Sequence, residues 1–450
     1  KNMTDAPTES KATFFRQSGW VALATVLGGV FLTAVHVVAS SKNGGMTEAE
    51  YSIFVTLLRV QLLISIPAAG LQTMFAHQTA AVSSDSERRQ LTATLSRVVA
   101  TIAILWFILL TLLAIIQSIN PGIYKQWNIK EPTALLLTLT IGLGFILLSA
   151  LRGVLTGQQN FWGLGWTIMI EGAGRFIAVA VAMTLGYQAT GGIAGVLIGL
   201  LISLTLAIWW LRDLPWQNRE PVEWSLWLKR TLPLAIGPGV MVFMFSADVI
   251  FVQTCFANEQ AHFYMPVATV GMAIFMFLTP MAIVMFPKLV NSNALGKKSQ
   301  ALKLALTGTA TLGGLTVLIL LLVPKLPLWV LYYNNSLYWQ SGSLVPFYIG
   351  ALYPLLLANL LISNLLAKER LGAWPCTILI ITAVGYAGTL IWQQPKLLNM
   401  IGNVTLTKDL LTPETQAAFL RIIQIFGGFN LIILALSVGL TWRYIKSQKT

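Results

Sequence analysis

Residues 92–118 read TATLSRVVATIAILWFILLTLLAIIQS. Arg97 is the one charged residue in this stretch, and it lies near its beginning. An α-helix needs roughly 20 apolar residues to cross about 30 Å of hydrocarbon. This stretch is longer, so we expect it to form a transmembrane helix.

Eleven further apolar runs of comparable length occupy most of the remaining chain. Apolar residues make up 56% of the sequence and charged residues 10%, a balance that excludes an ordinary soluble domain. The sequence therefore predicts an all-α integral membrane protein with twelve transmembrane helices. The other eleven runs are residues 18–40, 50–80, 132–154, 161–185, 190–211, 229–255, 261–287, 300–323, 342–366, 371–392 and 416–442.

Basic residues gather on one side of this topology. Alternate crossings place 20 of the 29 Lys and Arg residues on the side that carries both termini. The positive-inside rule assigns that side to the cytoplasm. The net charge of +13 is then explained by insertion and by anionic lipid headgroups, which argues against nucleic acid as a partner. The opposite side receives Lys42, Lys125, Lys130, Lys325, Lys396 and Lys408.

The loops and motifs argue against an enzyme. The longest stretch expected outside the hydrocarbon, residues 393–415, is too short for a nucleotide-binding or catalytic domain. The sequence contains no P-loop, CxxC or HExxH motif and only three His, so we expect neither ATP hydrolysis nor a metal site. A transporter without a cofactor would then use a gradient, with a proton or Na⁺ as a possible coupling ion.

An internal repeat divides the chain into halves. Tyr51 precedes Pro67 by 16 residues, and Tyr264 precedes Pro280 by the same distance, 213 residues further on. The spacing indicates two six-helix lobes, residues 1–212 and 229–450, joined by a cytoplasmic linker at 213–228. Chance is the alternative, because Tyr and Pro are common near the ends and kinks of membrane helices.

Two such lobes are suited to transport. A central cleft between them can open to either face when the lobes rock. Pro67, Pro280 and Pro238 are candidate hinge residues, because proline removes a helical hydrogen bond and bends the helix. Kinked bundles without transport activity also exist, so the prolines support a transporter without deciding for it.

Ionisable residues deep in the predicted helices are candidate site residues, because charge in hydrocarbon requires a partner or a water-filled cavity. Arg59 and Asp248 lie at comparable depths in opposite halves. They could meet as a latch between the lobes, bind substrate or a coupling ion, or each serve a local structural need. Glu171 and Arg175 are spaced i,i+4 and could pair with each other or contact substrate.

Two further kinds of residue lie near the ends of the predicted helices. Arg16 and Arg152 are expected at the cytoplasmic surface, where they could capture an anionic headgroup. Tyr51 and Tyr264 suit an interfacial aromatic belt, although their rings could also stack on sugars.

The motif RGVLTGQQNF at 152–161, followed by Glu171 and Arg175, resembles polysaccharide-export proteins of the multidrug/oligosaccharidyl-lipid/polysaccharide (MOP) exporter superfamily. The glycine-rich segment 191–199, Asp248 and Phe286-Pro287-Lys288 are also similar to segments of those proteins. The resemblance covers nearly the whole chain and depends on the order and spacing of these motifs.

The resemblance implies a MATE-like fold and a flippase that moves lipid-linked sugars to the outer leaflet. The implied cargo is an undecaprenyl-pyrophosphate-linked glycan for O-antigen, capsule or exopolysaccharide assembly, in a bacterial inner membrane with glycan polymerase or assembly proteins as partners. One departure concerns the deep charges, two Arg and two acids, which are not strongly cationic for binding a pyrophosphate.

Three other functions remain open at the level of sequence. A drug or cation antiporter of the same superfamily would carry an acidic cluster in its first lobe, where Glu171 stands alone. A polytopic glycan polymerase or ligase would carry a large external loop with paired basic residues. A scaffold without transport activity is the remaining alternative.

Overall fold

The computed structural model describes residues 11–80, 85–119, 132–214, 224–294, 301–367, 373–401 and 410–447, and within these ranges it contains helices and no strands. The all-α prediction is therefore confirmed. The helices in chain order are α1 (Lys11–Ala39), α2 (Glu48–Ile64), α3 (Ile66–Ala80), α4 (Asp85–Ile119), α5 (Pro132–Gly157), α6 (Phe161–Thr184), α7 (Ala189–Trp210), α8 (Trp224–Cys255), α9 (Asn258–Ala294), α10 (Ala301–Leu322), α11 (Leu326–Leu331), the 3₁₀ helix η2 (Ser336–Leu344), α12 (Val345–Ala367), α13 (Ala373–Ile401) and α14 (Pro413–Ser447).

Each of the twelve predicted spans coincides with a long helix or with the consecutive pair α2 and α3. Among the described residues, nine helices are long and apolar enough to cross a membrane, and ten if α2 and α3 count as one span. The described apolar part of α1, Leu23–Ala39, is shorter than this criterion requires. Large apolar side chains such as Phe107 and Leu322 are exposed on the helix surfaces, as expected for residues that face lipid.

The pair α2 and α3 forms one broken span. The two helices meet at Ser65 with a bend of 41°. Pro67 is the second residue of α3, where the missing N–H of proline is tolerated because first-turn amides have no helical acceptor. The sequence thus located a bend correctly at this position.

The other two hinge candidates differ from Pro67. Pro238 lies inside α8, which continues as one helix from Trp224 to Cys255. Pro280 lies within the bounds of α9, but its side chain is outside the described residues. The α2–α3 break therefore has no counterpart in a separate pair of helices at the equivalent place in the second half.

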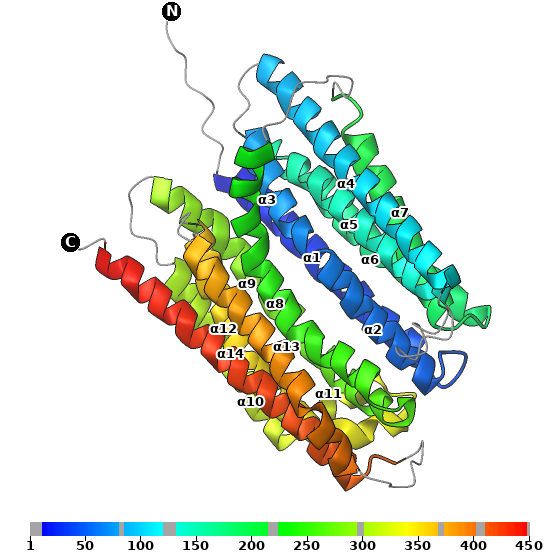
Figure 1. The fold of residues 1–450 in the computed structure, drawn as a ribbon. Coiled ribbons are helices and arrows are strands. Elements are labelled where there is room, and N and C mark those ends of the chain that lie inside the picture. Colours follow the sequence, from blue (N-terminus) through cyan, green and yellow to red (C-terminus); the bar gives the residue numbers. More distant parts are fainter. Residues whose placement is uncertain are drawn as a thin grey trace, which may run out of the picture.

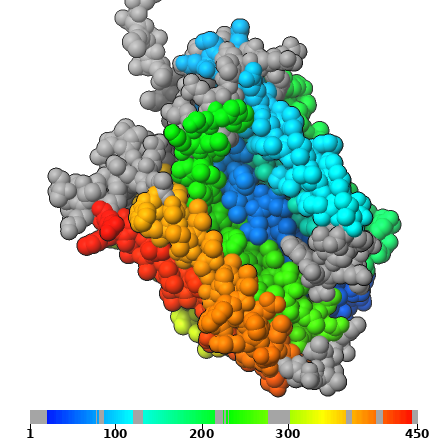
Figure 2. All heavy atoms as spheres, in the orientation of Figure 1, coloured from blue at the N-terminus to red at the C-terminus, as the bar shows by residue number. Residues whose placement is uncertain are grey.

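Helices α1–α7 and helices α8–α14 lie side by side as two groups with roughly parallel axes, and we call each group a lobe (Figure 1). Helix α8 packs against α2 along one part of its length and against α3 along another. Figure 2 shows the blue side chains of this α2–α3 region between cyan α4 and green α8. A Cβ atom added at Gly70 would lie 2.8 Å from the Cβ of Ala235, so the α3 and α8 backbones approach closely.

The first residue of α1 and the last residue of α14 lie at the same end of the bundle, which we call the terminal end (Figure 1). The opposite end, which carries the α1–α2 connection, is the loop end. There α11 and η2 contact α9, and α11 also reaches α1 of the other lobe. Residues 324–341, between the predicted spans 300–323 and 342–366, thus contain α11 and most of η2.

Candidate functional site

Tyr51 lies at the start of α2 and is fully buried at the boundary between the lobes. Its hydroxyl is hydrogen-bonded to the hydroxyl of Tyr332, which follows α11, at 2.7 Å. The same hydroxyl lies 3.1 Å from Nδ1 of His36 in α1. Tyr51 therefore joins a helix of the first lobe to the second lobe, and its expected place in an interfacial aromatic belt is wrong.

Two further polar contacts join the lobes near Tyr51. The hydroxyl of Ser52 donates to Oε1 of Gln253 in α8. Nδ2 of Asn335 donates to the carbonyl oxygen of Ser40 at 3.4 Å. We call this set of contacts, together with Tyr51–Tyr332 and the Arg59 contacts described next, the inter-lobe seam.

Arg59 in α2 is 2% exposed and is held by α9 of the other lobe. One guanidinium nitrogen donates to the carbonyl oxygen of Ala268 at 2.8 Å, and another lies 2.9 Å from the sulfur of Met272. The guanidinium also lies 5.5 Å from the ring centroid of Phe245, within reach of a cation–π interaction. Neutral groups of the second lobe thus contact the buried guanidinium directly.

Asp248 in α8 is fully buried inside the second lobe. The hydroxyl of Tyr264 in α9 donates to its carboxylate at 2.7 Å. Tyr348 of α12 interacts with the same carboxylate, and its ring meets that of Tyr264 edge-on at 6.0 Å. Tyr264 is fully buried as well, so its predicted interfacial position is also wrong.

Arg59 and Asp248 interact electrostatically across the lobe boundary. Within the described part of the chain, however, they form no ion pair at 4 Å or less. The space beside Arg59, which Phe245, Met272 and Tyr348 also line, is too narrow for a water molecule. The lobes are therefore in contact at the level of Arg59.

A second charged cluster lies within the first lobe, and we call it the ion triad. Glu171 in α6 accepts from Arg152 of α5 at 2.8 Å and from Arg175 of α6 at 2.5 Å. Arg152 also donates to the hydroxyls of Thr167 and Ser203, at 3.0 Å and 3.4 Å. The triad thus links α5, α6 and α7.

The ion triad corrects two expectations. Arg152 is 9% exposed and lies five residues before the end of α5, so it is an interior residue and not a surface one. The i,i+4 pair of Glu171 and Arg175 exists, but Arg152 adds a third charge to it. The side chain of Arg16 lies outside the described residues.

The structure also identifies residues that the sequence did not single out. Tyr332, Asn335 and Gln253 complete the seam from the second lobe. Their partners are 201 to 295 residues away in the chain, so no local pattern could reveal them. Within the described residues, no group of three His, Cys, Asp or Glu side chains could hold a metal ion.

The same fold occurs in solved transporter structures. A multidrug resistance MATE family transporter of the MOP superfamily, in an inward-facing conformation, matches with a TM-score of 0.68 and 13% identity over 96% of this chain and 99% of that one. The eukaryotic MATE transporter AtDTX14 matches with a TM-score of 0.62 and 10% identity, over 94% and 95% of the two chains.

A lipid flippase has the same fold as well. The lipid II flippase MurJ, in an inward closed conformation, gives a TM-score of 0.60 and 14% identity over 93% of this chain and 90% of that one. No family model matches the sequence, and no curated protein is detectably similar to it. At these identities the likeness establishes architecture, and the chain has the fold of the MATE and MurJ transporters of the MOP superfamily, as its sequence predicted.

Proposed function

We propose that this protein is an alternating-access transporter that flips a lipid-linked oligosaccharide or polysaccharide precursor to the outer leaflet for cell-surface glycan assembly. The inter-lobe seam is the observation that carries the proposal. It joins two lobes of a transporter fold at one end, mainly through hydrogen bonds between neutral groups. Such bonds exchange for water at a net cost of about 0.5–1.5 kcal/mol each, so rocking lobes can break and remake them.

The proposed orientation places the loop end outside the cell. The basic residues concentrate at the terminal end, which the positive-inside rule assigns to the cytoplasm of a bacterial inner membrane. In this orientation the seam closes the outer side of the pathway. Cargo would then enter from the cytoplasmic side while the seam is formed.

Cysteine labelling tests the orientation. Asn43, beyond α1, and Gln90, in the first turns of α4, are both exposed and lie at opposite ends of the bundle. We expect an impermeant thiol reagent on intact cells to label Asn43→Cys and not Gln90→Cys, with Cys255 and Cys376 replaced by alanine. The reverse pattern would overturn the orientation.

We propose that residues 1–212 and 229–450 move as the two lobes, with 213–228 as their linker. Arg59 would contact the cargo or hold the seam, according to which lobe arrangement is populated. The ion triad would keep α5, α6 and α7 together during the movement, because both of its ion pairs lie within one lobe. Pro67 would serve as the hinge, next to the bend at Ser65.

An ion gradient is the proposed source of energy, with a proton or Na⁺ as the coupling ion. Asp248 is the proposed coupling residue because its carboxylate is buried beside Tyr264 and carries no ion pair within 4 Å in the described part of the chain. Occupancy of this carboxylate would change the packing of α8 against α9. Asp248→Asn would then flip cargo at the same rate with and without a gradient.

A flipping assay tests the function. Purified protein in sealed vesicles is given a fluorescent polyprenyl-pyrophosphate-linked sugar, and dithionite quenching reports the fraction left in the inner leaflet. We expect protein-dependent flipping that accelerates under an imposed proton or sodium gradient. Flipping no faster than in protein-free vesicles would contradict the proposal, and equal rates under every gradient would indicate a passive scramblase.

A drug or cation antiporter is the second candidate, because MATE multidrug transporters share the fold. In this chain Glu171 is already bound by two guanidinium groups, which leaves the first lobe without an acidic side chain free to take a cation at that place. Export of a cationic dye from vesicles, without flipping of the lipid-linked sugar, would favour the antiporter.

A further inference from the structure

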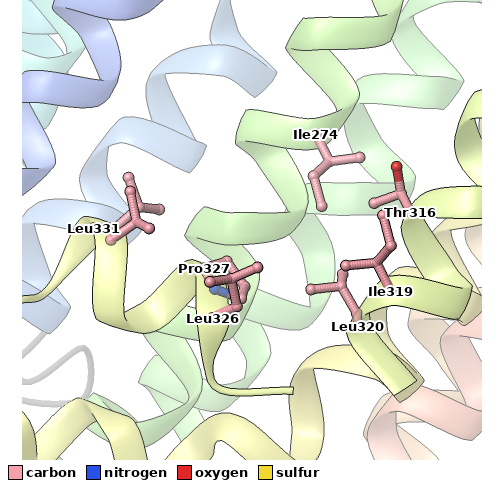
Figure 3. A pocket seen from close by; sticks show the side chains of 8 residues that line it. Ile274, Thr316, Ile319, Leu320, Leu326, Pro327 and Leu331 are labelled. Carbon is pink, nitrogen blue, oxygen red and sulfur yellow. The ribbon is translucent and has the colours of Figure 1, made fainter. Parts of the chain in front are cut away.

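An apolar groove lies on the second lobe at the loop end, between α9, α10 and α11. Its volume is about 320 Å³, at the lower end of the 300–1,000 Å³ typical of small-molecule sites. Figure 3 shows the labelled side chains of these helices converging on the groove. The lining residues are Ile274, Thr316, Ile319, Leu320, Leu326, Pro327, Val330 and Leu331.

The apolar lining of the groove favours a hydrocarbon ligand. Thr316 carries the single side-chain polar atom among the eight residues, and its hydroxyl donates to the carbonyl oxygen of Leu312 in its own helix at 2.8 Å. No side-chain donor of the lining is therefore left for water or a polar ligand. Apolar cavities of this kind remain dry and bind apolar molecules.

The groove is reached from the lipid. Val330 in its wall is 65% exposed, and Leu318 and Leu321 of α10 beside it are 59% and 56% exposed. Leu318 and Leu321 belong to the candidate membrane span Leu302–Leu322, so in a bilayer they face hydrocarbon next to the groove. A lipid chain can therefore enter sideways from the bilayer.

A basic residue adjoins the groove wall along the chain. Lys325 is the residue before α11, directly preceding the wall residues Leu326 and Pro327, and its side chain is exposed. Its stem packs beside Gly342, where an added Cβ would lie 2.5 Å from Lys325 Cγ. A cation next to an apolar groove complements a lipid with an anionic phosphate and a long chain.

The groove wall also adjoins the inter-lobe seam along the chain. Leu331 in its wall immediately precedes Tyr332, which bonds to Tyr51 of the other lobe. Ile274 is two residues beyond Met272, which contacts Arg59. A molecule with its chain in the groove would thus have its headgroup beside the outer end of the pathway.

We propose that the groove binds the hydrocarbon chain of the lipid-linked phosphate that the protein transports, with Lys325 facing the phosphate. This inference rests on the proposed flippase function. A flipped headgroup passes between the lobes while its chain stays in hydrocarbon, because each buried methylene favours the apolar phase by about 0.8 kcal/mol. The groove gives that chain a place next to the seam on the outer side.

Photo-crosslinking tests the site. Full-length protein in vesicles is irradiated with a polyprenyl pyrophosphate that carries a diazirine in its chain, and peptides are mapped by mass spectrometry. We expect labelling between Thr316 and Leu331, competed by unlabelled polyprenyl pyrophosphate and not by phosphatidylglycerol. Lys325→Gln should weaken competition by the pyrophosphate more than competition by the uncharged polyprenol.

A matched pair of variants controls for folding. Val330→Trp fills the groove and should lose most of this labelling, whereas Val384→Trp, a change at a similarly exposed valine of α13, should retain it. Equal labelling of the two variants would overturn the proposal, and so would phosphatidylglycerol that competes as well as unlabelled polyprenyl pyrophosphate. Either result would mean that the groove holds only nonspecific bilayer lipid. If flipping is normal and the groove is not labelled, the groove is not the site of the lipid chain, and the proposed function stands. If the groove is labelled and flipping is absent, the proposed flippase function is wrong.

Discussion

The inter-lobe seam and the ion triad are both buried and polar, but they differ in charge and in what they join. The triad places three charged side chains in contact, and all of them belong to the first lobe. The seam uses hydroxyls, amides and carbonyls, with Arg59 as its one charged member, and its contacts cross between lobes. A charged network inside a lobe resists separation, since opening it would expose uncompensated charge to a low-dielectric interior.

The difference indicates which contacts hold one lobe together and which contacts break when the lobes move. Removing Glu171 from the triad leaves two buried guanidinium groups without a counterion, which is strongly destabilising. Breaking a neutral seam contact costs much less, because water can replace the partner. We therefore expect variants of the triad to affect folding first, and variants of the seam to affect the balance between lobe arrangements.

The largest effect is expected for Glu171→Gln. Arg152 and Arg175 would both lose their counterion, at a cost of about 3–5 kcal/mol. Thermal unfolding of the purified protein in detergent should show a much lower midpoint and a lower yield. Glu414→Gln, at an exposed position in α14, is the control and should match the parent protein. A Glu171→Gln protein of normal stability would mean that the triad does not hold α5, α6 and α7 together.

An intermediate effect is expected for Arg59→Gln, and it should appear in transport. The variant loses charged hydrogen bonds to α9, each worth about 1.5–3 kcal/mol, so the closed seam would be less populated. The energy of one such bond is at least about the 1.4 kcal/mol that corresponds to a tenfold change. We therefore expect flipping to fall by roughly tenfold or more while the protein stays folded. Arg421→Gln, at an exposed arginine of α14, is the control.

A charge-swapped variant sharpens this result. Arg59→Asp combined with Asp248→Arg should remain inactive, since the two side chains form no ion pair at 4 Å or less in the described structure. Recovery of flipping in the double variant would instead show that they meet as a latch in another lobe arrangement. Normal flipping by Arg59→Gln would remove Arg59 from the pathway.

The smallest effect is expected for Tyr51→Phe. The variant loses one hydroxyl that bonds to Tyr332, at a cost of about 0.5–1.5 kcal/mol to the closed seam. With RT of about 0.59 kcal/mol, this cost corresponds to a several-fold larger population of the open seam. A cysteine that replaces Asn335, which is 3% exposed, should therefore react several times faster with a thiol reagent. Tyr353→Phe removes a hydroxyl bond to Ala310 within the second lobe and should leave this rate unchanged. Equal rates in both variants would mean that the Tyr51 bond does not hold the lobes closed.

Sequence patterns located the long helices well. The predicted span 300–323 corresponds to α10, Ala301–Leu322, and 190–211 corresponds to α7, Ala189–Trp210. A run of apolar residues sets a helix by itself, because backbone groups in hydrocarbon must bond within the segment. The prediction was less accurate at residues 393–415, where α13 continues to Ile401 through Pro395.

The candidate site was only partly predictable. Glu171 and Arg175 could be paired from their i,i+4 spacing, and Arg59 and Asp248 could be recognised as buried charges that need partners. Their actual partners could not be read from spacing, because Arg152 and Ala268 come from other helices. The aromatic residues misled the prediction, since a tyrosine near a helix end fits an interfacial belt and a buried seam equally well by sequence.

The sequence by itself determined that the chain forms long membrane helices, which end carries the basic residues, and where one span bends. Each of these follows from local composition, because hydrocarbon length, loop charge and proline act within a few residues. Only the tertiary structure decided that Tyr51 bonds to Tyr332, 281 residues away, and that Arg152 enters the interior of the first lobe. Those contacts depend on how the helices pack against one another, and no single segment contains that information.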